Sequence, residues 1–386
     1  MADPLFASFF LAGFECSTHR RRDGRRLDLS AATGHDRFMD ADYARCHAWG
    51  LQTVRDGIRW HLIERQPGRY DFAGVLPALR AAQAGGVEVI WDLFHYGWPD
   101  DLDFFAPAFV TRFAALAGAF ARLVVEETGR PPLVAPTNEI SFVAWGAGTD
   151  GFLNPFALGR GAEIKAQLVR AAIAAIEAVW AVAPAARIVH PDPLIHVAPD
   201  PAKPEDHEAA GHAHRAQYES WDMLAGYRRP ELGGHPRYLD IVGVNHYPWN
   251  QWIYNGPEIK PGHPLYRPLR SLLAEVYARY RRPLLLSEVG TEGDGRAPWL
   301  RYVGREARAA LRAGIPIAGV CLYPVTDYPG WDNERHCPTG LWGYPDATGE
   351  RPLYQPLARE LRRQQRLQAR MHTAAARKQS LAGRVP

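Results

Sequence analysis

Short apolar runs alternate along the chain with longer segments whose apolar residues recur at helical spacing. The short runs are rich in Val, Ile, Leu and Phe and predict strands, whereas the segments between them predict helices. This alternation is typical of βα units built around a parallel sheet. We expect strands at 9–15, 51–56, 87–94, 132–138, 187–190, 240–245, 283–288 and 316–323, and helices at 36–49, 74–85, 107–128, 161–182, 265–280 and 298–313.

Eight predicted strands with interleaved helices favour a single closed (β/α)8 TIM barrel. A doubly wound open sheet is the alternative, but no glycine-rich phosphate turn follows the first strand. Long βα loops at 191–235 and 246–264 are expected to cover the C-terminal face of the barrel. We expect the catalytic barrel to span 1–356 and a basic C-terminal helix or tail to occupy 357–386.

A glutamate stands at or directly after the end of the fourth and of the seventh predicted strand. Glu139 follows the fourth strand and Glu288 ends the seventh. In such a barrel the carboxyl ends of the strands point into one shared bowl, so the two side chains are expected to meet. Cleavage of a glycosidic bond needs two carboxyl groups across a sugar-sized cavity, one protonated and one ionised. A single glutamate at a strand end would more often be an ion-pair partner, but the pair favours catalysis.

The segments around these glutamates resemble those of clan A (β/α)8-barrel glycoside hydrolases. The closest likeness, in divergent form, is to the family 1 β-glucosidase-like enzymes. "TNE" at 137–139 and "SEVG" at 287–290 match the segments that carry the acid/base and the nucleophile in that clan. The other matches, in chain order, are "FLAG" at 10–13, Arg55 with Trp60, His95 with Pro99, and Asn245 with Tyr247.

The resemblance implies a retaining glycosidase that cleaves a β-linked small-molecule or oligosaccharide glycoside. Glu139 would be the acid/base and Glu288 the nucleophile. Asn138 would bind the 2-hydroxyl of the sugar and His95 another ring hydroxyl. Arg55 and Tyr247 would hold the Glu288 carboxylate. The remaining candidates for substrate binding are Asn245, Tyr323, Trp331 and Glu15.

The last predicted strand departs from the family pattern. The family reads WSLLDNFEW where this chain reads "YPVTDYPGW" at 323–331, which puts Tyr323 at the first Trp and Gly330 at the Glu. In the family that Glu binds the outer hydroxyls of the sugar, so the resemblance implies no particular sugar. The first-strand Gln of the family is also unmatched. Glu15 is a candidate to bind hydroxyls in its place, with a structural role as the alternative.

Two further features concern the expected mouth of the bowl. The segment "HRRRDGRR" at 19–26 carries five Arg, which could attract an anionic substrate such as a uronic acid or a phosphorylated sugar, or could form a solvated loop. Indole faces stack on the apolar side of sugar rings. The tryptophans predicted in loops on this face are Trp98, Trp145, Trp249, Trp252 and Trp331.

Three other functions compete with hydrolysis. A transglycosylase would use the same intermediate and pass the sugar to an acceptor, and an apolar, Trp-lined acceptor side would favour it. A non-catalytic sugar-binding barrel would explain the departures on the first and last strands. An aldolase or isomerase is disfavoured because no lysine stands at a predicted strand end: Lys165, Lys203 and Lys260 lie in a helix or in loops.

The distribution of charge along the chain indicates which kinds of binding partner to expect. The formal net charge is +3, but residues 357–386 alone hold eight Arg or Lys and one Glu, so the rest of the chain is slightly acidic. We therefore do not expect a nucleic-acid partner. The basic segment predicts a surface helix that frays at its end, with a contact to a partner or membrane as the alternative. The sequence leaves the oligomeric state open.

No membrane span is expected, because no apolar run reaches the necessary length. The N-terminus lacks a positively charged leader, which favours a cytoplasmic location. The four cysteines show no CxxC spacing and predict free thiols. His207, His212 and His214 cluster in a predicted loop without the spacing of a metal site, so we expect neither a metal nor an organic cofactor.

Overall fold

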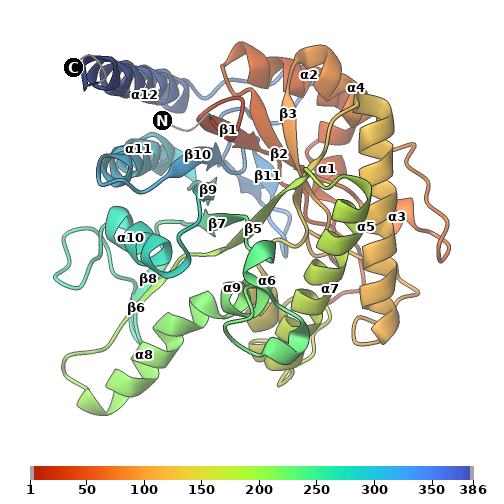
Figure 1. Ribbon diagram of the computed structural model, residues 1–386, viewed down its shortest axis with the longest axis horizontal. Coiled ribbons are helices and arrows are strands. Elements are labelled where there is room, and N and C mark those ends of the chain that lie inside the picture. The colour runs from red at the N-terminus through yellow and green to blue at the C-terminus, as the bar shows by residue number, and fades with distance from the viewer. Residues whose placement is uncertain (1–3, 383–386) are drawn as a thin grey trace.

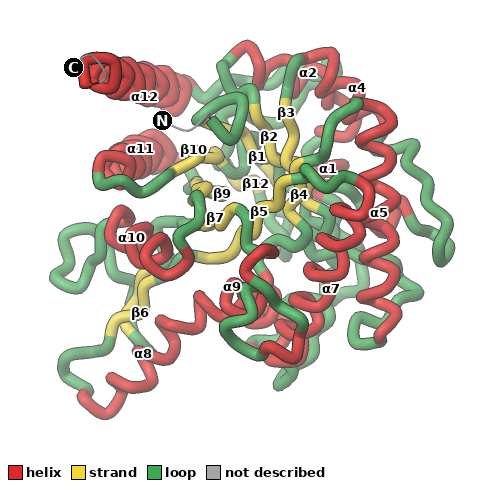
Figure 2. Tube along the Cα trace, viewed as in Figure 1, coloured by secondary structure: helices red, strands yellow, loops and turns green. Residues whose placement is uncertain are grey.

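Eight parallel strands hydrogen-bond in a closed ring within residues 4–382, the part of the chain that this computed structural model describes. Figure 2 shows these strands at the centre of the molecule, with helices around them. The predicted (β/α)8 barrel is therefore confirmed. In order around the ring the strands are β1 (Phe10–Gly13), β10 (Ile317–Leu322), β9 (Leu284–Val289), β7 (Ile241–Asn245), β5 (Arg187–Pro193), β4 (Leu133–Ala135), β3 (Glu88–Asp92) and β2 (Thr53–Gly57), which pairs with β1.

The main helices form the outer wall (Figure 1). The predicted helix at 107–128 has clear start and stop signals in the sequence. It begins at a proline and ends before Gly129, which adopts a left-handed backbone conformation with a φ of 68°. The six predicted helices are all present, with ends shifted by at most four residues. They are α2 (His35–Ala48), α4 (Leu76–Gly85), α5 (Pro107–Thr128), α7 (Gly161–Val182), α10 (Leu269–Tyr280) and α11 (Arg296–Arg312).

The connections hold more regular structure than the sequence predicted. The segment 191–235, expected as a loop, contains two α-helices and three short 3-10 helices, and His207, His212 and His214 lie on the first of the α-helices and not in a loop. Two short strands also pair outside the barrel between this segment and 246–264. The additional elements are α1 (Leu29–Ala32), α3 (Trp60–Ile63), α6 (Ile140–Val143), a π-helix (Ala144–Thr149), β6 (His196–Ala198), α8 (His207–Arg215), α9 (Glu219–Leu224), β8 (Gln251–Ile253), β11 (Tyr328–Pro329) and β12 (His336–Cys337).

The apolar core has two layers, because successive strand residues point to opposite sides of the barrel wall. The outer layer packs the strands against the helices and contains most of the buried aromatic side chains. The inner layer fills the barrel and ends where polar side chains begin near the carboxyl ends of the strands. Its members are Phe6, Leu11, Ile90, Ala135, Val189, Ile241, Leu285, Cys321 and Tyr323.

The basic C-terminal segment forms a long helix, α12 (Gln355–Ala382), which lies beside α11 in Figure 1. It is more than a fraying surface helix, because Leu357, Leu361, Gln364 and Gln368 are buried. Packing of this kind ties the helix to the barrel. The division of the chain into 1–356 and 357–386 stays a prediction, and residues 383–386 lie outside the described part.

By length and composition α5 could cross a membrane, with a mean hydropathy of 1.6. The expectation that no segment meets these criteria therefore does not hold for this helix. Phe109, Phe113 and Phe120 on its apolar face are buried in the outer core layer. Core helices of large barrels share this composition, so length and hydropathy alone do not make α5 a membrane span.

A buried histidine links α2 to the barrel. His35 Nδ1 lies 2.8 Å from Asp42 and Nε2 lies 2.9 Å from Asp56, and the ring stacks on Phe14 at 3.7 Å. Arg351 pairs with the same Asp42 at 2.7 Å and so attaches the chain before α12. Burial alone would lower the pKa of His35, but the Asp56 and Asp42 carboxylates outweigh it and raise the pKa to about 9.

The raised pKa of His35 predicts that the protein loses stability at alkaline pH. Because the pKa of His35 is higher in the folded state than its unfolded value of 6.5, protonated His35 contributes to the free energy of unfolding. This contribution is fully present below pH 6.5 and is lost as the pH rises through about 9. The loss is on the order of 3 kcal/mol. Urea unfolding at pH 6, 7.5 and 9.5 measures it, with His35→Gln as the control that lacks the titrating group. A wild-type curve parallel to that of His35→Gln over this range would contradict the assignment.

Candidate active site

A cavity of about 1530 Å³ opens at the carboxyl ends of the barrel strands. Side chains that follow β1, β3, β4, β7 and β10 line it, as expected for this fold. Both of the long segments predicted to cover the face, 191–235 and 246–264, contribute to its wall. Of the predicted site residues, those that line the cavity are Glu15, His95, Glu139, Tyr247, Glu288, Tyr323 and Trp331.

Glu139 stands at the start of α6, a few residues beyond the end of β4. Its backbone is in the left-handed region with a φ of 47°, a conformation that costs a non-glycine residue about 1–3 kcal/mol and is common at functional sites. The backbone N–H donates to the Pro191 carbonyl at 2.9 Å, which fixes this turn to β5. The buried carboxyl group accepts hydrogen bonds from the Tyr96 hydroxyl at 2.8 Å and the Asn245 amide at 3.0 Å.

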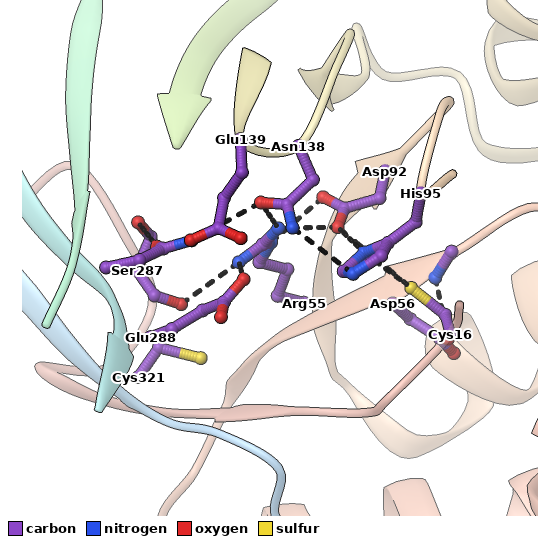
Figure 3. Close-up of polar contacts among 12 residues, drawn as sticks. Cys16, Arg55, Asp56, Asp92, His95, Asn138, Glu139, Ser287, Glu288 and Cys321 are labelled. Atoms are coloured by element: carbon purple, nitrogen blue, oxygen red, sulfur yellow. Dashed lines mark hydrogen bonds and ion pairs between the residues drawn. The ribbon is translucent and has the colours of Figure 1, made fainter. Parts of the chain in front are cut away.

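The carboxyl groups of Glu139 and Glu288 lie in one buried cluster but in different surroundings (Figure 3). Burial raises the pKa of Glu139, and the negative charge of Glu288 raises it further, to about 8. Glu139 therefore holds a proton at neutral pH. Glu288 instead accepts hydrogen bonds from Arg55 at 2.8 Å and from the Tyr247 hydroxyl at 2.6 Å, one on each oxygen. One site thus contains a proton donor and a carboxylate.

Arg55 is the cation that organises the floor of the site. It points inward from β2, is 1% exposed and contacts Asp92 through two nitrogens at 2.6 and 2.9 Å. The same guanidinium donates to Glu288 and, at 2.7 Å, to the Asn138 side-chain oxygen. Burial alone would lower the pKa of Arg55, but Asp92 and Glu288 raise it well above its ordinary value. Arg55 is therefore charged throughout the usual pH range and balances two carboxylates.

Asn138 and Asn245 lie behind the cavity lining. The Asn138 oxygen accepts from Arg55, and its amide nitrogen donates to the Tyr96 hydroxyl at 2.8 Å and faces His95 Nε2 at 3.2 Å. Both polar atoms of Asn138 are thus engaged inside the protein, so its expected contact with a sugar 2-hydroxyl stays a prediction. Asn245 accepts from the Ser287 hydroxyl at 2.6 Å, which leaves its amide group directed at Glu139.

Tyr96 is a site residue that the sequence analysis missed. It is buried, has a φ of 72°, lines the cavity and connects Asn138 to Glu139 through its hydroxyl. The only signal in the sequence is its place directly after His95 in the matched motif. A left-handed conformation at a tyrosine cannot be inferred from the sequence, because few non-glycine residues adopt it.

Cys16, Asp92 and His95 form a buried cluster whose potential ligand atoms lie within 4.8 Å of one another. His95 Nδ1 is 2.9 Å from Asp92 and 3.2 Å from the Cys16 sulfur. The Arg55 guanidinium already contacts both Asp92 oxygens, and a divalent ion here would lie against that positive charge. Burial and the nearby Asp92 also raise the pKa of Cys16, which disfavours a thiolate ligand. The cluster therefore suits a hydrogen-bonded support for His95 better than a metal centre, and the predicted lack of a metal stays a prediction.

The aromatic side chains divide between the cavity and the core. Trp331 lines the cavity, with its ring 4.8 Å from His19 and 5.7 Å from Tyr96. Trp98 lies in the loop after β3, as expected, but does not line the cavity: this side chain is buried against Phe104, and its indole N–H donates to the Leu102 carbonyl, so it packs in the core. The other three tryptophans predicted there, Trp145, Trp249 and Trp252, do line the cavity.

The outer part of the cavity is apolar and open to solvent. Trp145 is 46% exposed, Trp249 54% and Leu158 69%, and all three line the mouth. Exposed clusters of large apolar side chains mark binding surfaces. Phe142 continues the apolar wall from Trp145 to Tyr96, with its ring 5.9 and 5.8 Å from theirs. The cavity therefore has an apolar, Trp-lined outer side.

The arginine-rich segment 19–26 does not reach the cavity, since none of its arginines is among the described lining residues. Arg20 and Arg26 pair with Asp100, and Arg21 and Arg25 pair with Glu334. Arg22 donates to a backbone carbonyl and lies over the ring of Phe156. The hypothesis that this segment binds an anionic substrate gains no support, because these cations are already occupied.

No protein-family model and no curated protein sequence matches the chain. Its structural neighbours are β-glycosidases. The β-glucosidase from Thermotoga maritima in complex with deoxynojirimycin superposes with a TM-score of 0.73 and 15% identity, covering 92% of this chain and 97% of that one. The β-glycosidase BGL167 gives 0.68 and 19%, covering 87% of each chain. At such identities the comparison establishes the shared barrel fold, in agreement with the divergent likeness seen in the sequence.

Proposed function

We propose that the protein is a retaining glycosidase that cleaves a β-linked glycoside, with Glu139 as the acid/base and Glu288 as the nucleophile. The observation that carries the proposal is the difference between the two buried glutamates in one cavity. Glu139 holds a proton at neutral pH, since burial and Glu288 raise its pKa to about 8. Glu288 accepts from Arg55 and Tyr247. A donor and a carboxylate in one cavity are the two groups that glycoside hydrolysis requires.

The first step forms a covalent intermediate. Glu139 donates its proton to the glycosidic oxygen while a Glu288 oxygen attacks the anomeric carbon, the bond to the leaving group breaks, and the sugar becomes an ester of Glu288. In the second step the Glu139 carboxylate removes a proton from water, the resulting hydroxyl group bonds to the anomeric carbon, and the ester bond breaks. Two inversions at the same carbon give net retention.

A set of 4-nitrophenyl glycosides of several sugars tests this function. The expected result is release of nitrophenol from at least one β-glycoside, with the β-anomer of the free sugar as the first product in the proton NMR spectrum. An α-anomer as the first product would show an inverting mechanism. Absence of turnover on every glycoside, together with measurable sugar binding, would favour the non-catalytic sugar-binding barrel.

Transglycosylation is the second candidate, and the apolar mouth formed by Trp145, Leu158 and Trp249 favours it. An apolar acceptor bound there would react with the glycosyl-enzyme in preference to water. The measurement is the product ratio when an aliphatic or aryl alcohol is added to the reaction. A transglycosylase gives mainly the new glycoside at millimolar alcohol, whereas a hydrolase gives mainly free sugar.

A further inference from the structure

Glu15 is a third carboxyl group in the catalytic cavity and is only partly satisfied by the protein. It follows β1, lines the cavity and is 6% exposed. Its Oε1 atom accepts hydrogen bonds from the backbone N–H of Ser17 at 3.1 Å and from the Ser17 hydroxyl. Among the described residues no group donates to Oε2. The nearest basic nitrogen is His95 Nε2, 3.9 Å from Oε1, and it also faces the Asn138 amide.

Two hydroxyl groups in the same cavity also lack partners. The hydroxyls of Tyr323 and Thr339 are buried, and neither has a hydrogen-bond partner among the described residues. Both residues line the cavity, and Tyr323 follows β10, the strand that pairs with β1 ahead of Glu15. Burial and the nearby Glu15 charge raise the pKa of Tyr323, so its hydroxyl keeps its proton and can donate or accept. Buried hydroxyls are nearly always hydrogen-bonded, so unpartnered ones at a cavity wall indicate a polar ligand.

The position of Glu15 relative to the catalytic pair sets which part of a sugar it would meet. His95 separates Glu15 from the Asn138 side chain, which contacts Arg55 beneath Glu288. If the anomeric carbon lies between Glu139 and Glu288, the His95 side chain separates Glu15 from the reacting part of the sugar. It therefore faces ring positions remote from the reacting carbon.

The charge of this part of the cavity excludes an anionic sugar. Arg55 is already paired with Asp92 and Glu288. The Lys and Arg side chains of the described lining are also paired: Lys165 and Arg228 contact Glu219 at 2.9 and 3.1 Å, and Arg229 contacts Glu231 at 2.8 Å. A ring carboxylate or phosphate would lie among Glu15 and Glu288 without a free cation to balance it.

We propose that Glu15, together with the hydroxyls of Tyr323 and Thr339, selects an uncharged pyranose by binding ring hydroxyls remote from the anomeric carbon. The proposal rests on the proposed function for the placement of the anomeric carbon. Oε2 accepts from one or two sugar hydroxyls, and the Tyr323 and Thr339 hydroxyls bind their neighbours. Glycosides of uronic acids and of phosphorylated sugars are poor substrates.

The test combines a charge-removing variant with substrates that lack single hydroxyls. Glu15→Gln keeps the shape of the side chain, and Glu292→Gln removes a carboxylate at the cavity wall that pairs with Arg335. With the best neutral 4-nitrophenyl glycoside, Glu15→Gln is expected to lower kcat/KM by about 10- to 100-fold, the usual effect of losing a hydrogen bond to a charged group. Glu292→Gln changes kcat/KM by less than about threefold.

Substrates deoxygenated at C3, C4 or C6 then locate the contact. At least one deletion lowers kcat/KM of the wild-type enzyme by about tenfold or more, and the same deletion has little effect in Glu15→Gln, because the interaction is already lost. Equal losses in both proteins, or a wild-type preference for glucuronides over glucosides, would overturn the proposal.

Binding keeps the proposal testable if turnover is absent. Calorimetry with D-glucono-1,5-lactone, an uncharged sugar lactone, is expected to show at least about tenfold weaker binding by Glu15→Gln than by Glu292→Gln. Tyr323→Phe provides a second variant, since the Tyr323 hydroxyl has no partner among the residues that the structure describes and its loss leaves the packing intact. Unchanged lactone affinity in both Glu15→Gln and Tyr323→Phe, with unfolding temperatures like the wild type, rejects the proposal whether or not the protein is a hydrolase.

Discussion

Glu288→Ala is expected to lower kcat on the best 4-nitrophenyl β-glycoside by at least about 10⁴-fold, because it removes the carboxylate proposed to form the ester at the anomeric carbon. Glu288 is the carboxylate to which both Arg55 and Tyr247 donate, so its removal leaves these two donors directed at an empty space. Azide is small enough to enter that space. Added azide should restore turnover and give the α-glycosyl azide, since it attacks from the side that the carboxylate occupied.

Two measurements separate loss of the nucleophile from loss of the fold. The unfolding temperature of Glu288→Ala should stay near that of the wild type, because Arg55 keeps Asp92 and Asn138 as partners and the repulsion between Glu288 and Glu15 is removed. A 2-fluoro sugar inactivator should label Glu288 in the wild-type protein and leave the variant unlabelled. Labelling of any other residue, or a β-glycosyl azide as the rescued product, would contradict the role of Glu288.

Glu139→Ala should slow glycosides with poor leaving groups by about 10²- to 10⁴-fold, the usual contribution of a general acid. Glycosides with good leaving groups, such as dinitrophenol, need little protonation, so their first step should be nearly unaffected. Azide should rescue this variant as well and give the β-glycosyl azide, because it replaces water at the side of Glu139. Equal effects on good and poor leaving groups would exclude Glu139 as the proton donor.

The pH profile gives an independent test of Glu139. Burial and Glu288 raise its pKa to about 8, and the enzyme needs the protonated form, so kcat/KM should fall as pH rises through 8. The hydrogen bond from the Tyr96 hydroxyl lowers this pKa. Tyr96→Phe should therefore move the alkaline limb to higher pH, whereas Glu292→Gln should leave it in place. An alkaline limb that moves to lower pH in Tyr96→Phe would contradict this assignment.

Periodicity predicted the scaffold well because the strands and helices are set by local patterns. The helices at 107–128 and 161–182 have the predicted ends. The glutamate pair also followed from the sequence, since strand order in a barrel places Glu139 and Glu288 in one bowl. The prediction needed only the position of each residue relative to its strand.

The features that were missed depend on contacts between distant parts of the chain. Tryptophan is a residue type that stacks on sugars, but the sequence does not show that Trp98 packs against Phe104 in the core. The sequence left open whether the arginines of 19–26 bind an anion or form a solvated loop, and only the structure shows that Asp100 and Glu334, far away in sequence, pair with them. Tyr96 needed a left-handed backbone that its residue type disfavours.

In the proposed mechanism, the dependence of the Glu139 pKa on the charge of Glu288 would let Glu139 act in both steps of the reaction. While Glu288 is charged, its field keeps the proton on Glu139. Once Glu288 is esterified its charge is gone, and that contribution to the proton affinity of Glu139 disappears with it. Glu139 then changes from a group that gives up a proton into one that can take a proton from water. Formation of the proposed ester on Glu288 would thus convert Glu139 from an acid into a base.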